Sequence, residues 1–226
     1  MLEAGNDGDS TGNSGVIGVG DVQWMTAASG ILHDEFHSPA FTKSGGALEM
    51  VQLWVNLPAR HKMSAPRYQT ILNRHIPLVA LPQGAGSVRI IAGNFADAHG
   101  PASTYSPLNV WDLQLEAAGA ATLRIPAGHI SAVVVLRGRV SVNDSAWANG
   151  PQWVLLGPAG DEIRVRAEQQ SSVLLLSGVP ILEPIVGYGP FVMNSREEIE
   201  QAMRDFQAGK FGRMPPALGS GASASV

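Results

Sequence analysis

The stretch VWDLQLEAAGAATLRIPAGHISAVVVLRGRVSV at Val110–Val142 decides the fold class. Its short runs of Val, Leu and Ile partly alternate with polar residues, and Gly or Pro separates one run from the next. Such spacing is typical of antiparallel strands joined by tight turns. The later runs PQWVLLG, DEIRVRAE and SSVLLLSG continue the pattern. We therefore predict an all-β fold, with a small barrel or sandwich in this half of the chain.

The N-terminal half is also strand-like. The runs VIGVGD, VQWMT and ILHDEFH are bounded by Gly-Asp and Ser-Gly turns, LEMVQLWVNLP (Leu48–Pro58) alternates well enough for a strand, and SVRIIAGNF follows a proline-bounded loop. Around Gly100 the composition changes to Pro, Ser and Thr, which indicates a linker. We predict an N-terminal barrel over 1–100, a C-terminal barrel over 101–190, a helical segment over 191–212 and a disordered tail over 213–226.

One α-helix is predicted, from about Ser195 to Gln207. Ser195 and Glu198 have the spacing of a capping box, and Gly209 provides a stop. The apolar stripe of this helix consists of Ile199, Met203 and Phe206. A stripe of this kind packs against a core, so the helix is expected to be structural.

Composition excludes several functions. The 226 residues carry a formal charge of -4 without a Lys/Arg cluster, so no direct nucleic-acid partner is expected. There is no cysteine, which leaves His and carboxylate side chains as the strong metal ligands. No apolar run is long enough to span a bilayer, and no signal peptide is recognisable, so no membrane association is expected and the cytoplasm is the default compartment.

A candidate metal site lies in GILHDEF. His33 and Glu35 are two residues apart, so on a strand both side chains project from the same face. An imidazole and a carboxylate supply two of the three ligands in the 2-His-1-carboxylate arrangement that suits non-haem Fe(II). An H-x-E pair alone is weak support, because most such pairs are surface residues.

The remaining histidines do not complete this site. His37 is on the same nominal face as His33, but four residues of strand span about 13 Å, so the two could share an ion only through a bulge or bend. The others are expected to be solvated or capping residues: His61, His75, His99 and His129. Motifs for a serine nucleophile, a phosphate loop or a dinucleotide site are absent from the sequence.

Three long runs carry a resemblance to a known family. In order, GVIGVGDVQWMTAASGILHDEF, QLWVNLPARHKMSAPRYQ and EPIVGYGPFVMNSREEIEQAMRDFQAGKFG closely resemble the pirin family, over roughly Asp9 to Gly212. The resemblance implies a bicupin, that is, two cupin-type β-barrels with a mononuclear iron in the N-terminal barrel. It also implies that His33 and Glu35 are metal ligands.

One family segment has no counterpart. The Pro-His-Pro-His run that supplies two further histidines in pirins is missing, so we expect the first barrel to be incomplete and the chain to begin inside it. Two ligands should hold Fe(II) weakly or not at all, since the ordering cost falls on fewer bonds. Missing strands would also expose a sheet edge. We expect a monomer if the barrel is intact, and self-association through that edge otherwise.

Two functions stay open at this point. Some pirins have quercetin 2,3-dioxygenase activity, in which the metal would act on a flavonol-like small molecule as template and Lewis acid. Other members are transcriptional or metabolic coregulators, which implies a non-catalytic module with a protein partner. The missing histidines favour the second function. Asp34 should lie on the opposite face from the ligands, and Trp24 and Trp54 are expected to pack in the core.

Overall fold

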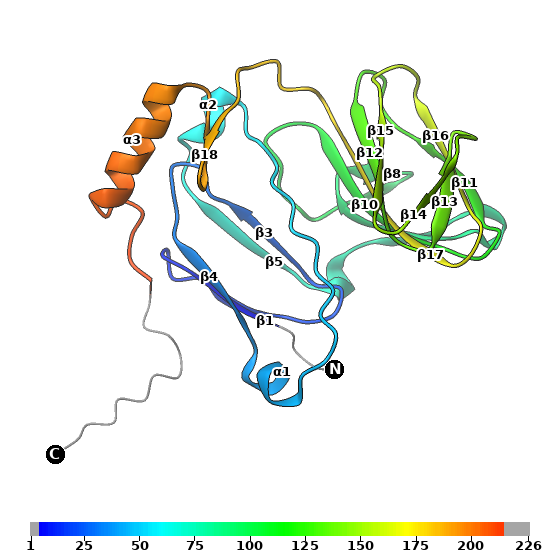
Figure 1. The fold of residues 1–226 in the computed structure, drawn as a ribbon, viewed down its shortest axis with the longest axis horizontal. Helices are drawn as coiled ribbons and strands as arrows, with labels where there is room; N and C mark the ends of the chain where they lie inside the picture. The colour runs from blue at the N-terminus through cyan, green and yellow to red at the C-terminus, as the bar shows by residue number, and fades with distance from the viewer. Residues whose placement is uncertain (1–4, 215–226) are drawn as a thin grey trace. The chain divides into compact units, whose positions relative to one another are not determined.

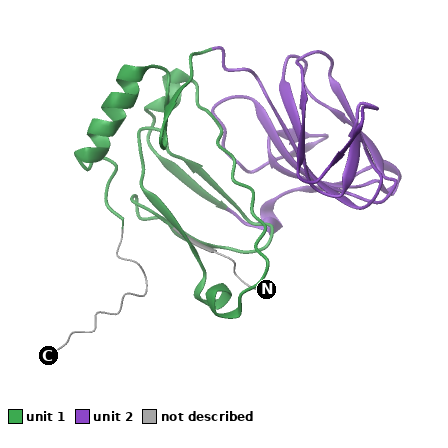
Figure 2. Cartoon of the chain, viewed as in Figure 1, with its two compact units in different colours: residues 1–70, 183–226 green, residues 71–182 purple. Residues whose placement is uncertain are grey.

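A computed structural model of the chain describes the backbone of residues 5–214 and the side chains of residues 8–214. The chain divides into two compact units, one formed by residues 1–70 and 183–226 and the other by residues 71–182 (Figure 2). Strands dominate both units, and helices are few (Figure 1). No helix in the described part of the chain is both long and apolar enough to cross a membrane.

The first unit is built from three small sheets. Strands β1, β2 and β4 form a three-stranded sheet in the order β2-β1-β4, β3 pairs with β5, and β18 pairs with β19. The bounds of these strands are β1 Gly5–Asp9, β2 Ser14–Ile17, β3 Val22–Thr26, β4 His33–His37, β5 Arg67–Ile71, β18 Val186–Tyr188 and β19 Phe191–Met193. The helices of this unit are α1 Pro39–Ser44, α2 Ala59–Lys62 and α3 Arg196–Gln207.

The second unit contains two larger sheets that share one core, and a two-stranded sheet formed by β8 and β9. A six-stranded sheet has the order β15-β12-β17-β10-β7-β6, and a four-stranded sheet has the order β11-β16-β13-β14. Residues of both sheets, such as Trp111 and Leu175 from the first and Leu123 and Val165 from the second, belong to a single buried cluster. Alternate residues of the strands face this cluster, as expected from the two-residue period of a strand, and β17 is buried on its other face as well.

The elements of the second unit match the turn-punctuated runs of the sequence. Their bounds are η1 Asn73–His75, β6 Leu78–Ala80, η2 Pro82–Gly84, β7 Gly86–Ala92, β8 Asn94–Phe95, β9 Ala98–His99, β10 Leu108–Leu115, β11 Ala120–Arg124, β12 Ile130–Arg137, β13 Arg139–Val142, β14 Trp147–Asn149, β15 Gln152–Leu156, β16 Glu162–Ala167 and β17 Ser171–Gly178. The predicted all-β class is confirmed.

The unit boundaries differ from the predicted ones. Residues 71–100 belong to the second unit, because β7 pairs with β10 and β6 pairs with β7 in the six-stranded sheet. The chain returns to the first unit at Glu183, whose carboxylate accepts a hydrogen bond from the Ala59 backbone N–H at 2.6 Å. Most of the predicted disordered tail lies outside the described residues.

The predicted strand at Leu48–Pro58 is wrong. The structure has neither helix nor strand between Gly45 and Pro58, because no neighbouring strand pairs with this segment. Trp54 is 68% exposed, so its predicted place in the core is also wrong, whereas Trp24 is half-buried. The bulky apolar side chains that are exposed in this segment are Leu48, Met50, Val51, Trp54 and Val55.

The C-terminal helix is confirmed, together with its cap. The Ser195 hydroxyl accepts a hydrogen bond from the Glu198 backbone N–H at 3.2 Å, and the Glu198 carboxylate accepts one from the Ser195 backbone N–H at 3.0 Å. These two bonds satisfy N–H groups that the first turn of a helix leaves without partners. Ile199 of the predicted apolar stripe is buried, whereas Phe206 is exposed.

Candidate metal centre

Strand β4 carries both predicted ligands. His33 and Glu35 are two residues apart on this strand, so their side chains leave the same face of the sheet. Strand β1 lies beside β4 and places Asp9 opposite His33 (Figure 1). Both His33 and Glu35 are exposed. The structure therefore presents one imidazole and one carboxylate on one accessible face.

Asp34 lies on the other face of β4. It is half-buried and stands opposite Gly8 of β1, where a Cβ atom on Gly8 would come within 3.3 Å of the Asp34 Oδ1 atom. A side chain at position 8 would therefore crowd this carboxylate. Its direction is the one that strand alternation predicted, and it keeps Asp34 away from the His33 and Glu35 side chains.

His37 ends the same strand. Its ring packs edge-on against Phe41 of α1, with ring centroids 5.3 Å apart and planes at 73°. An edge-on contact of this kind is a favourable aromatic arrangement. His37 therefore has a packing partner of its own at the end of β4.

Three of the other histidines are exposed or partly exposed. His61 accepts a hydrogen bond from the Arg60 guanidinium at 3.1 Å, and the His99 ring lies 2.7 Å from the Asn94 side-chain oxygen. His75 is exposed in η1. None of these positions brings a third donor to His33 and Glu35.

His129 corrects the prediction of a solvated or capping histidine. It is 7% exposed, and its Nδ1 atom lies 3.3 Å from the Ser177 hydroxyl. Burial lowers the pKa of this imidazole, because the charged form loses hydration. The reason lies in strand alternation: Ser131 and Val133 of β12 face the core, and His129 precedes them with the same period.

Asp9 is a structural carboxylate that the sequence reasoning missed. It is fully buried, and it accepts hydrogen bonds from the backbone and side chains of Thr11 and Asn13 at 2.7 to 3.0 Å. Burial opposes ionisation, but these bonds outweigh it and hold the pKa of Asp9 below its ordinary value. The run DSTGN, with Asp and Asn around a Gly, was the available signal for such a turn. The Asp9 carboxylate therefore stabilises the turn that contains Thr11 and Asn13.

The donors do not form a complete metal centre among the side chains that the structure describes, those of residues 8–214. No group of three His, Cys, Asp or Glu side chains in this range is placed to hold one ion. Catalytic sites for transition metals normally use three protein ligands and leave a further position open. Two donors on β4 therefore fit part of such a site, and the described residues do not fit the whole of it.

Comparison with known proteins identifies the family. The Pirin family model matches residues 6–55, and the model of the Pirin C-terminal cupin domain matches residues 110–212. A Pseudomonas aeruginosa protein named "Putative quercetin 2,3-dioxygenase" is 56% identical over 203 residues, which cover 90% of this chain and 71% of that protein.

One solved structure supports the same assignment, and a second shows the same fold. The crystal structure of quercetin 2,3-dioxygenase from Acinetobacter baumannii matches with a TM-score of 0.89 and 50% identity, covering 94% of this chain and 74% of that chain. A bacterial pirin from Escherichia coli, solved in complex with nickel(II), shares the fold at a TM-score of 0.56 and 18% identity, covering 80% and 70%. The chain therefore belongs to the pirin family of bicupin proteins.

Proposed function

We propose that this protein is a metal-dependent oxygenase of the quercetin 2,3-dioxygenase type, in which His33 and Glu35 are ligands of an Fe(II) ion. The observation that carries the proposal is the placement of both side chains on one accessible face of β4, in a chain whose relatives are named for this activity. The substrate class is a flavonol-like small molecule. Iron, when bound, would supply the Lewis acidity for the reaction.

The number of donors determines the metal affinity that we expect of the site. Among the side chains of residues 8–214, His33 and Glu35 have no third donor grouped with them, so a bound ion should exchange readily with solvent. A bound ion would be held on the face of β4 from which both side chains project. Activity should accordingly require an excess of added metal.

A turnover assay tests the proposal. The protein is incubated with excess Fe(II) without oxygen, then mixed with quercetin and oxygen, and both the loss of quercetin absorbance and the uptake of O₂ are recorded. We expect His33→Ala and Glu35→Gln to lower turnover at least about tenfold, since even the outer partners of metal ligands often contribute that much. The matched controls are His75→Ala and Glu116→Gln, at exposed positions of the second unit. Equal turnover in all variants would refute the assignment of the ligands.

The small number of metal donors favours a second function. With two donors among the described residues, the double cupin could act as a non-catalytic module that binds a transcription factor or a metabolic enzyme. Absence of turnover from the unchanged protein at saturating Fe(II) would support this alternative and contradict the proposed oxygenase.

A further inference from the structure

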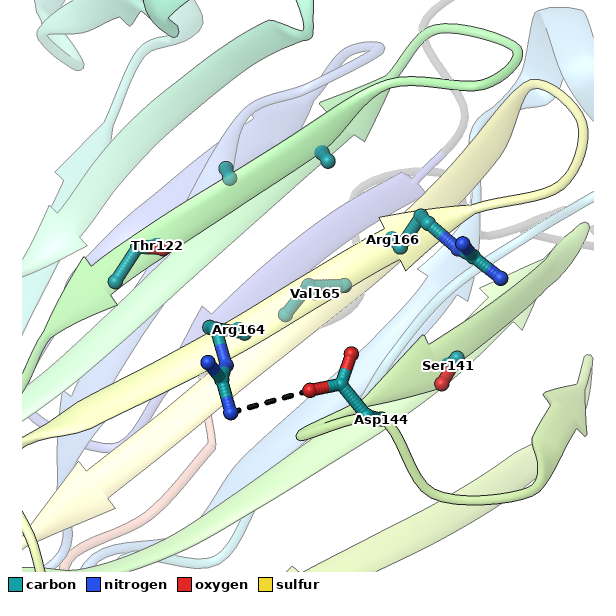
Figure 3. Close-up of a pocket in the computed structure, with 8 residues that line it drawn as sticks. Thr122, Ser141, Asp144, Arg164, Val165 and Arg166 are labelled. Atoms are coloured by element: carbon teal, nitrogen blue, oxygen red, sulfur yellow. Dashed lines mark ion pairs between the residues drawn. The ribbon is translucent and has the colours of Figure 1, made fainter.

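The outer face of the four-stranded sheet in the second unit contains a shallow hollow of about 180 Å³ (Figure 3). It lies along β16, the strand between β11 and β13. Arg166 of β16 stands opposite Ala120 of β11 and opposite Ser141 of β13. Because both neighbours have small side chains, space remains on each side of the arginine stem.

Arg166 differs from the other arginines of this face in having no carboxylate partner. Arg124 pairs with Glu162 at 3.5 Å, Arg139 with Glu168 at 2.8 Å, and Arg164 with Asp144 at 3.1 Å. Among the side chains of residues 8–214, Arg166 forms no ion pair. This face therefore carries four arginines and three paired carboxylates, and the positive charge of Arg166 has no carboxylate paired with it.

Trp147 holds the Arg166 guanidinium in place. The guanidinium carbon of Arg166 lies 5.0 Å from the centre of the Trp147 ring, and that of Arg139 lies 5.4 Å from it. Contacts of this kind are attractive, and they reduce the rotamer freedom that a long side chain loses on binding. In Figure 3, Arg164 turns toward Asp144 while Arg166 extends away from that pair. Arg166 is thus oriented before any ligand arrives.

We propose that this hollow binds a side-chain carboxylate from an acidic segment of a partner protein. A guanidinium matches a carboxylate in a two-pronged geometry, and a single negative charge balances the single unpaired arginine. The Thr122 hydroxyl lines the same hollow and has no hydrogen-bond partner among the described residues. The volume favours a side chain, because pockets for free small molecules usually enclose about 300 to 1,000 Å³.

Peptide binding tests the proposal. A labelled peptide of four glutamates and a matched peptide of four glutamines are titrated with the full chain, and binding is followed by fluorescence anisotropy at low and high salt. We expect the glutamate peptide to bind in a salt-sensitive manner and the glutamine peptide not to bind. Arg166→Gln should weaken binding at least tenfold, and Arg166→Lys should weaken it less, because lysine keeps the charge but loses the planar fork.

The matched control is Arg124→Gln, on the same face but outside the hollow. It should change the affinity by less than twofold, and all variants should keep the melting temperature of the unchanged protein. Equal weakening by Arg124→Gln and Arg166→Gln would show a diffuse electrostatic attraction and overturn the proposal. Three other results would also overturn the proposal. They are unchanged binding by Arg166→Gln, tighter binding of a phosphoserine peptide than of the glutamate peptide, and no binding of the glutamate peptide.

Discussion

His129 shows how a single residue couples this fold to pH. It is buried beside Ser177 in the second unit, and burial lowers the pKa of its imidazole below the ordinary value of 6.5. Between the lowered pKa and pH 6.5, the unfolded chain binds more protons at this position than the folded chain does. The free energy of unfolding therefore has its full value above about pH 6.5 and falls as the pH is lowered.

The measurement is urea unfolding of the second unit between pH 5 and 8. We expect His129→Gln to flatten the decline below pH 6.5, since glutamine does not titrate there, while His75→Gln leaves the decline unchanged. The quantity to compare is the slope of the unfolding free energy against pH, because the substitution also alters packing and therefore the unfolding free energy itself. A decline that persists in full in His129→Gln would contradict a role for this imidazole.

Residue types alone predicted some of these positions and missed others. The His33 and Glu35 pair was predictable because the two-residue period of a strand is local. His129 was not placed correctly from its Pro-Ala-Gly turn, because its burial depends on how β12 continues into the core. Asp9 was overlooked because its hydrogen bonds are made within a turn that carries no catalytic motif.

At the scale of elements, the capping box of α3 gives the clearest prediction. Ser195→Ala removes the hydroxyl that accepts the Glu198 N–H bond, which should cost about 1 kcal/mol of helix stability. Hydrogen exchange of the amides in α3 should then accelerate about fivefold, if they exchange by local opening. Ser195→Asp keeps an oxygen at the cap and should leave the exchange rates nearly unchanged. Equal acceleration in both variants would show that the cap does not stabilise α3.

Strands that are bounded by strong turn signals were predictable from the sequence. The absence of a strand at Leu48–Pro58 was not, because it depends on whether a neighbouring strand pairs with this segment. The strands of the second unit follow from alternation and from the Gly and Pro residues between them. Leu48–Pro58 also alternates, yet it forms no strand, because a strand requires hydrogen bonds to a neighbour that the pattern does not specify. The same dependence explains the boundary at Ile71, where β6 and β7 join the second unit by pairing.

For the whole molecule, the bicupin architecture was predictable from long family-like runs, whereas completeness of the metal centre is a property of tertiary structure. Ligands of one ion come from several strands, and the described side chains of residues 8–214 include two donors on β4 but no group of three. We propose that His33 and Glu35 bind the metal as an incomplete set of ligands. An incomplete set lowers affinity, because fewer bonds offset the cost of fixing the ligands.

The amount of iron that the protein retains distinguishes an incomplete set of ligands from a complete one. The protein of this sequence is loaded with Fe(II) without oxygen, desalted, and analysed for iron by mass spectrometry beside His33→Ala and the control His75→Ala. We predict well below one equivalent of iron in the unchanged protein, the same amount in His75→Ala, and less in His33→Ala. A full equivalent in the unchanged protein, or equal iron in all three proteins, would contradict the account.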